Sequence, residues 1–175
     1  MKATVPLRSA AANTRLNIAI AFFSAGFVAV LALSPYWDRS IQVVHLFESF
    51  PYLIAGALCL WNRKSGYALA VAAGTFWLWT AGFLTTIVRN GFERLAMLAT
   101  TGHVDRLGIL LAVPAALMTG GLALTAFWGY LRLPEKRLRD LALFVSAFII
   151  VGAWFLGIFA LFAPQYLGIF RRLLH

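Results

Sequence analysis

The chain has 175 residues, of which 62% are hydrophobic and 12% are charged, with a mean hydropathy of +0.83. These are too few charged residues to cover a soluble domain of this size, so the composition indicates an integral membrane protein. The net charge of +9 comes from short basic clusters between apolar runs. That distribution is typical of membrane topology, and we expect no nucleic acid among the partners.

The first apolar run follows a basic N-terminal segment. Residues 1–15 contain no acid, and Leu16–Leu33 carries no charge. A run of this length spans a bilayer once the flanking basic and aromatic residues take the two interfaces, which predicts a first span at 16–36. A cleaved signal peptide is the alternative, but the long apolar core and Pro35 disfavour it.

The second apolar run, at 41–61, is the one that carries polar residues. His45, Glu48 and Tyr52 fall at i, i+3 and i+7, so they share one face of a helix. Pro51 cannot donate to the carbonyl four residues earlier, and we expect it to kink the helix and release that carbonyl. Glu48 is the only carboxylate inside an apolar run. An ionisable residue in hydrocarbon is a functional-site candidate by default.

Three further runs predict spans at 66–88, 107–131 and 141–162. Small residues recur every four positions in two of them, a spacing that lets helix backbones approach closely in lipid. These predicted packing residues are Gly66, Ala70 and Gly74 in the third span and Ala112, Ala116 and Gly120 in the fourth.

The longest connection, residues 89–106, differs from the short turns elsewhere. Phe92 and Leu95 alternate with charged residues at helical spacing. This pattern predicts a short amphipathic helix on the membrane surface at about 91–100. The predicted fold is therefore an all-α integral membrane protein, in which residues 1–175 form one bundle of about five transmembrane helices with a short interfacial helix.

Basic residues distinguish two topologies. Five spans with a cytoplasmic N-terminus place nine basic residues inside and six outside, which the positive-inside rule favours. If the second run instead dips into the membrane and returns to the same side, the chain has four spans, with eight basic residues inside and seven outside. We expect a multi-pass protein of the bacterial inner (cytoplasmic) membrane with a cytoplasmic N-terminus.

The favoured orientation gathers ionisable residues at the outer face. His45 and Glu48 could meet His103 and Asp105, which precede the fourth span. Imidazoles and carboxylates together could hold a metal ion such as copper, zinc or iron, although neither H-x-x-E nor H-x-D is a metal signature. In the alternative interpretation, Glu48 pairs with Arg39 or a loop arginine near the interface, and His45 lies at headgroup level.

Other chemistries lack their motifs. The sequence contains no GxGxxG, GxxxxGK[ST], GxSxG or HExxH pattern. Its single cysteine, Cys59, forms no disulfide framework and no CxxC motif. Haem held by two histidines would need a second intramembrane histidine beside His45.

Two functions remain. The favoured one is a small subunit that packs against partner membrane proteins, lipids or pigments in a larger complex, or against itself, with no catalytic activity of its own. The alternative is a metal-binding or proton-handling oxidoreductase or transport subunit with its site around His45 and Glu48. Burial there would favour the protonated carboxyl group unless a metal or an arginine compensates. The small loops favour the first function.

Overall fold

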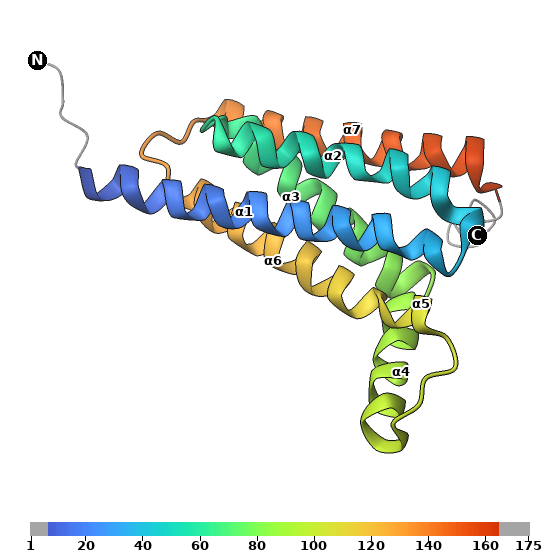
Figure 1. Cartoon of the computed structure of the whole chain (residues 1–175). Helices are drawn as coiled ribbons and strands as arrows, with labels where there is room; N and C mark the ends of the chain where they lie inside the picture. Colours follow the sequence, from blue (N-terminus) through green and yellow to red (C-terminus); the bar gives the residue numbers. More distant parts are fainter. Residues whose placement is uncertain (1–6, 165–175) are drawn as a thin grey trace, which may run out of the picture.

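The computed structural model describes residues 7–164, with side chains from residue 13 onward, and the regular elements in this part of the chain are all helical. Five helical segments are long and apolar enough to cross a membrane, and they form an elongated bundle (Figure 1). The predicted fold class is confirmed. The segments are Asn13–Tyr36, Arg39–Leu60, Lys64–Leu84, Leu107–Leu131 and Leu138–Phe162.

The first two spans are an antiparallel pair, α1 (Leu7–Leu33) and α2 (Gln42–Leu60). Two 3-10 turns join them, η1 (Ser34–Tyr36) and η2 (Arg39–Ile41). Pro35 lies in the first turn of η1 and has no N–H to donate to the Leu31 carbonyl, four residues earlier, which the Ser34 hydroxyl donates to instead. The second run is one continuous helix, so the structure has the five-span arrangement and not the re-entrant alternative.

The third span ends earlier than predicted. It consists of α3 (Lys64–Trp79) and η3 (Thr80–Leu84), a π-helical segment. The chain then breaks at Thr86, whose φ of 54° is rare for a β-branched residue. This break stops the span at residue 84 instead of 88 and turns the chain into the next helix.

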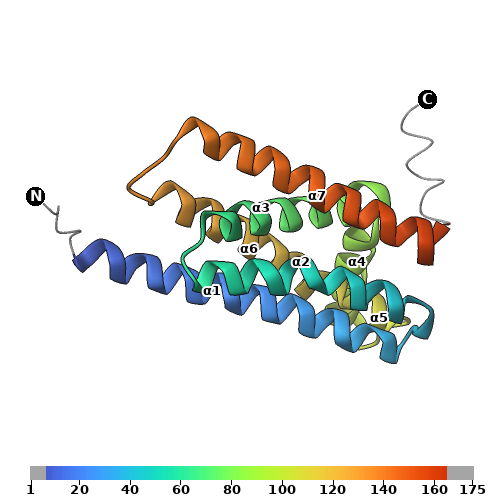
Figure 2. The ribbon, with the colours of Figure 1, turned by 90° about the horizontal axis from the view of Figure 1, so that it is seen from above.

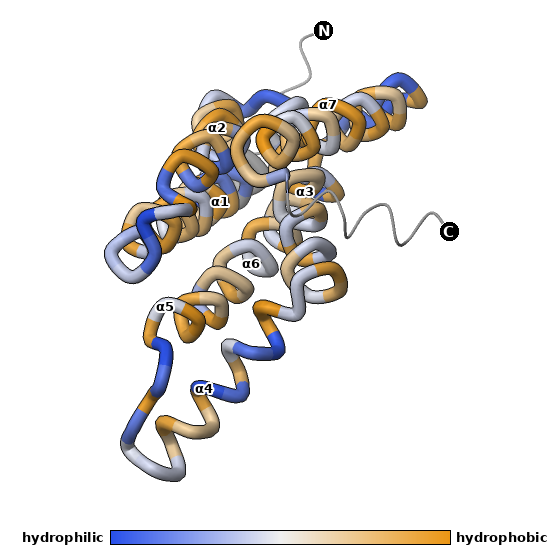
Figure 3. The backbone as a smooth tube through the Cα atoms, turned by 90° about the vertical axis from the view of Figure 1, so that its right-hand side faces the viewer, coloured by the Kyte–Doolittle hydropathy of each residue, from blue (hydrophilic) through white to orange (hydrophobic). Residues whose placement is uncertain are grey.

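That helix, α4 (Ile87–Thr101), crosses the long axis of the bundle and projects from its end (Figures 1 and 3). A helix in this direction lies along the membrane surface when the bundle crosses the bilayer. Phe92 and Leu95 are exposed on it. A helix is therefore present where the interfacial helix was predicted, beginning at Ile87 rather than residue 91, and Gly102 ends it with a φ of 68°. Its position in the membrane interface stays a prediction.

Three helices complete the bundle: α5 (Leu107–Leu110), α6 (Ala112–Leu131) and α7 (Leu138–Phe162). In place of a predicted start at 141, the last helix begins at Leu138. It packs against α3 and α2 (Figure 2).

Asp140 holds the end of the bundle where α7 begins. Its side chain is buried and accepts hydrogen bonds from Lys64 Nζ at 2.7 Å, from the Tyr130 hydroxyl at 3.2 Å and from the backbone N–H of Arg137 at 3.1 Å. These partners come from α3, α6 and the loop before α7. The cluster therefore ties three parts of the chain together.

The third-span packing residues lie inside the bundle. A Cβ atom added to Gly66 would lie 2.6 Å from a backbone nitrogen of α2, and one added to Gly74 would lie 2.8 Å from the carbonyl oxygen of Thr119 in α6. Ala70, between them, is fully buried. This face therefore brings α3 close to its own neighbours in the chain.

The fourth-span packing residues are less uniform. Ala112 is buried, whereas Ala116 and Gly120 are half-buried. A Cβ atom on Gly120 would meet only a side-chain carbon of Leu78, at 4.0 Å. The close approach of α6 to α3 therefore occurs at Thr119 and not at Gly120.

The topology gives a labelling prediction. Because α1 begins and α7 ends at opposite ends of the bundle (Figure 1), single cysteines at Ser9 and at His175, which lies outside the described residues, should react from opposite sides of the membrane. Cys59 is first replaced by alanine. With the predicted orientation, His175→Cys reacts from outside and Ser9→Cys from inside. Reaction of both from one side would contradict the odd number of spans.

Candidate functional site in an intramembrane pocket

The polar face predicted for α2 is turned into the bundle. Glu48 is 6% exposed and Tyr52 is fully buried, while His45 remains partly accessible. The Tyr52 hydroxyl donates to the carbonyl of Ala73 in α3 at 3.0 Å. Three residues one or two turns apart thus bring polar groups into a bundle made mostly of apolar side chains.

Pro51 affects this face through the backbone. Because proline has no N–H, it leaves the carbonyl of Phe47 without its usual helical donor. The indole N–H of Trp154 in α7 donates to that carbonyl at 3.0 Å. The released carbonyl thereby connects α2 to α7 on the turn next to Glu48.

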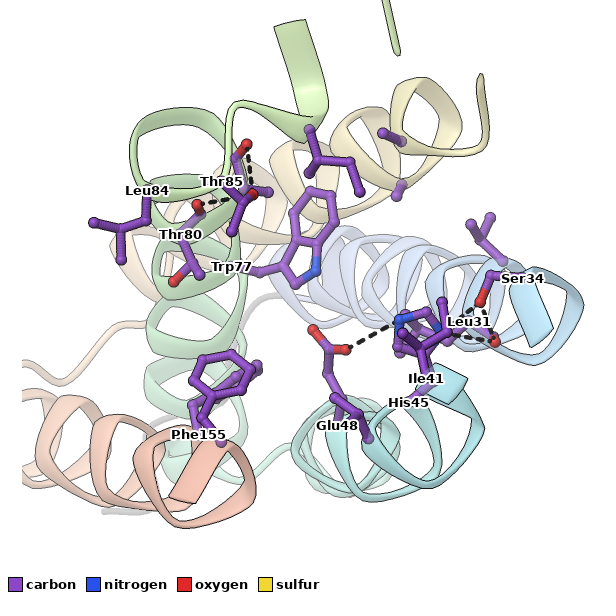
Figure 4. A pocket seen from close by; sticks show the side chains of 17 residues that line it. Leu31, Ser34, Ile41, His45, Glu48, Trp77, Thr80, Leu84, Thr85 and Phe155 are labelled. Carbon is purple, nitrogen blue, oxygen red and sulfur yellow. Dashed lines mark hydrogen bonds and ion pairs between the residues drawn. The ribbon is translucent and has the colours of Figure 1, made fainter. Parts of the chain in front are cut away.

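His45 and Glu48 form the only ion pair within the described spans that contains a histidine. The distance from His45 Nε2 to Glu48 Oε2 is 3.8 Å (Figure 4). The other ring nitrogen, Nδ1, contacts the Ser34 hydroxyl and lies 3.3 Å from the carbonyl oxygen of Leu31. The Ser34 hydroxyl itself donates to Leu31 at 2.9 Å, so its oxygen can accept from Nδ1.

These contacts assign the tautomer of the imidazole. Two acceptors, Ser34 Oγ and the Leu31 carbonyl, face Nδ1, which therefore carries a hydrogen. In a neutral ring, Nε2 then presents its lone pair to Glu48. At 3.8 Å the two groups are at ion-pair distance and not at hydrogen-bonding distance. An ionised carboxylate would present another lone pair, so the two groups attract each other only when one proton lies on Nε2 or on the carboxyl group.

A pocket of about 140 Å³ opens beside this pair. Trp77 in α3 lines the same pocket, and its indole nitrogen lies on the side of the ring toward Glu48 (Figure 4). Phe155 and Phe159 of α7 supply further aromatic wall, and most of the other lining residues are aliphatic. His45 and Glu48 are the only ionisable residues that line it, among the residues described.

The π-helical segment supplies the remaining polar groups of the wall. Thr80 and Thr85 both line the pocket. The backbone N–H of Thr85 donates to the Thr80 carbonyl at 3.0 Å, five residues back, and its hydroxyl lies 3.3 Å from the same oxygen. Single π turns within α-helices occur frequently at functional sites, and this one adjoins the buried acid.

A second, outer pocket of about 530 Å³ adjoins the first and shares Ser34, Ile41 and Ile87 with it. Asp38 lines this outer pocket and acts electrostatically on His45. Hydrogen bonds from the hydroxyl and backbone N–H of Ser40 hold the pKa of Asp38 below its usual value. Asp38 therefore stays ionised until the pH falls through that lowered pKa. It places a negative charge at the entrance, where Arg106 and Asp105, the latter paired with Arg94, also line the pocket.

The structure separates the four residues predicted to bind a metal. His45 and Glu48 meet, whereas His103 and Asp105 lie in the exposed connection between α4 and α5. Asp105 pairs with Arg94 at 3.3 Å, and the backbone N–H of His103 donates to Thr101. Within residues 7–164, no three His, Cys, Asp or Glu side chains gather to hold a metal ion. A metal at these residues stays a prediction.

The alternative pairing of Glu48 with an arginine is absent from the described spans. The ion-pair partner of Glu48 is His45, and Glu48 is buried inside the bundle. The placement of His45 at headgroup level stays a prediction. Arg39 lies in η2, at the loop end of the bundle. The helical turns between Arg39 and Glu48 separate the two charges.

Three residues of the site, Ser34, Trp77 and Thr80, are not singled out by the sequence, which predicts one uninterrupted span at 66–88 around the last two. Three threonines, Thr80, Thr85 and Thr86, lie near the end of this apolar run. They are the sequence feature that could have indicated a break in the helix. No local pattern links Ser34 or Trp77 to Glu48, because these contacts join different helices.

The fold and this pocket define a multi-pass membrane protein with an ionisable pair buried in one span. No protein-family model, curated protein or solved structure matches the chain.

Proposed function

We propose that this membrane protein takes up and releases a proton at the His45–Glu48 pair. The observation that carries the proposal is the position of His45. With Nδ1 facing two acceptors, its Nε2 faces a buried carboxyl group at 3.8 Å. At this ion-pair distance, one exchangeable proton lets the two side chains attract each other instead of opposing two lone pairs.

The surroundings support exchange of this proton. Burial in an apolar pocket disfavours a lone charge, and no lysine or arginine among the described lining residues compensates the carboxylate. His45 is more accessible than Glu48 and lies between it and the outer pocket. A proton that enters from the side of Asp38 binds at Nε2, the ring nitrogen that carries no hydrogen in the neutral imidazole, and passes from there to the buried acid.

Infrared spectroscopy of the protein in lipid nanodiscs tests the proposal. We expect a carboxylic-acid C=O band that titrates with pH, shifts when His45 is replaced by glutamine and is absent in Glu48→Gln. Glu93→Gln, which changes an exposed acid on α4, is the matched control and should leave the band unchanged. A Glu48 carboxylate that stays ionised beside a neutral His45 at every pH would contradict the proposal.

A role as a subunit that packs against partner membrane proteins, lipids or pigments stays a prediction. Its sequence argument rested on the small-residue faces, and Gly66 and Gly74 pack against helices of the same chain. The membrane-spanning helices imply contact with lipid. The pocket therefore gives more support to proton handling than the small-residue faces give to a partner.

A further inference from the structure

We propose that the pocket beside Glu48 binds a small lipophilic ammonium ion, the protonated form of an apolar amine, in exchange for the proton of the His45–Glu48 pair. The inference rests on the proposed function, because the proton that is displaced is the one the pair holds. It adds the chemical class of the ligand.

The charges around the pocket favour a cation. The groups that face Glu48 are His45 and Tyr52 from α2 and the Trp77 indole from α3, and Tyr52 already donates to a backbone carbonyl. From η1, Ser34 contacts His45, and Asp38, between η1 and η2, adds negative charge. With His45 neutral and Glu48 ionised, the site carries one uncompensated negative charge, which an ammonium ion neutralises.

The walls of the pocket suit the apolar part of such a ligand. Trp77, Phe155 and Phe159 present aromatic rings, and aromatic faces attract cations as well as apolar groups. The hydroxyls of Thr80 and Thr85 already lie within hydrogen-bonding distance of backbone carbonyls of their own helix. Glu48 is thus the strongest acceptor that remains for an N–H donor.

The exchange balances in charge and protons. An ammonium ion approaches through the outer pocket, whose charged lining residues are Asp38, Asp105 and Arg106, and it passes on the side of ionised Asp38. When the ammonium reaches Glu48, the carboxyl group gives up its proton and pairs with the cation. One positive charge enters and one proton leaves, so the net charge of the buried site does not change.

Binding of 2-phenylethylamine to the protein in nanodiscs tests the proposal, with 2-phenylethanol as the uncharged probe of the same shape. We expect the amine to bind roughly tenfold or more tightly than the alcohol, the scale of one hydrogen bond to a charged group. Its apparent Kd should weaken by about tenfold per pH unit below the pKa of the pair, as an exchange of one proton requires. Calorimetry in buffers of different ionisation enthalpy should detect one released proton.

Two variants complete the test. Glu48→Gln should lose the preference for the amine while still binding the alcohol, which also shows that the pocket is folded, and Glu48→Asp should keep the preference. Equal binding of amine and alcohol by the unmodified protein, or an unchanged preference in Glu48→Gln, overturns the inference. If the infrared band of Glu48 titrates but the protein binds the amine no more tightly than the alcohol, the proposed ligand class is wrong and the proposed function stands. If the band is absent, the proposed function fails as well.

Discussion

Gly74→Leu is expected to prevent α3 from packing against α6 and to lower the free energy of unfolding by about 3 kcal/mol or more. At Gly74 the added Cβ alone would lie 2.8 Å from the carbonyl oxygen of Thr119 and 3.1 Å from the Cβ of Ala123. The first contact is with backbone, which cannot move aside as the end of a flexible side chain can. Thermal unfolding in detergent, followed by the loss of helical circular dichroism or by aggregation, measures the effect.

Gly157→Leu in α7 is the matched control, because a Cβ atom there meets nothing within 4 Å. Both changes place the same side chain in a transmembrane helix, and both gain the same helix propensity over glycine. Gly157→Leu should unfold at the temperature of the unmodified protein or above it. Equal unfolding temperatures for the two variants would mean that the α3–α6 approach does not limit stability.

Glycine spacing in the sequence predicted this contact only in part. The four-residue recurrence correctly marked Gly66 and Gly74 as positions where backbones approach. The same recurrence marked Gly120, which has far more room. Spacing identifies a face of small residues, but which helix lies against that face depends on the rotation of all neighbouring helices, and no local pattern records that rotation.

The candidate site, like the glycine contacts, was predicted from the sequence only in part. Periodicity placed His45 and Glu48 on one face, and the rarity of acids in hydrocarbon drew attention to Glu48 before any contact was known. The metal prediction needed His103 and Asp105 to reach that face, and they lie in the connection after α4. The break at Thr86 directs α4 away from the bundle, which is a property of backbone geometry that residue types alone did not predict.

Asp140 and Glu48 are both buried acids, and replacing each by its neutral amide is expected to affect the stability of the protein in different ways. Asp140 accepts from Lys64, Tyr130 and the backbone N–H of Arg137, so it has donors on several sides. Asp140→Asn removes the acceptor charge and leaves Lys64 without its carboxylate, so the unfolding temperature should fall. Asp140 stabilises the fold, so Asp140→Asn should leave the pH-dependent properties of the pocket unchanged.

Glu48→Gln is expected to leave stability within about 1 kcal/mol of the unmodified protein or to raise it, because replacing a buried ionisable group by a neutral one of the same shape removes a desolvation cost. The glutamine amide can donate to His45 Nε2, and Trp77 in the same pocket carries an indole N–H that could donate to its oxygen. The exchangeable proton is lost, however, so the titrating infrared band should disappear and pH-dependent binding should fall to background. Unfolding temperature and proton exchange are measured on the same nanodisc preparations. A clear loss of stability in Glu48→Gln, matching that in Asp140→Asn, would assign Glu48 to the fold and remove the physical reason for placing a function at this pair.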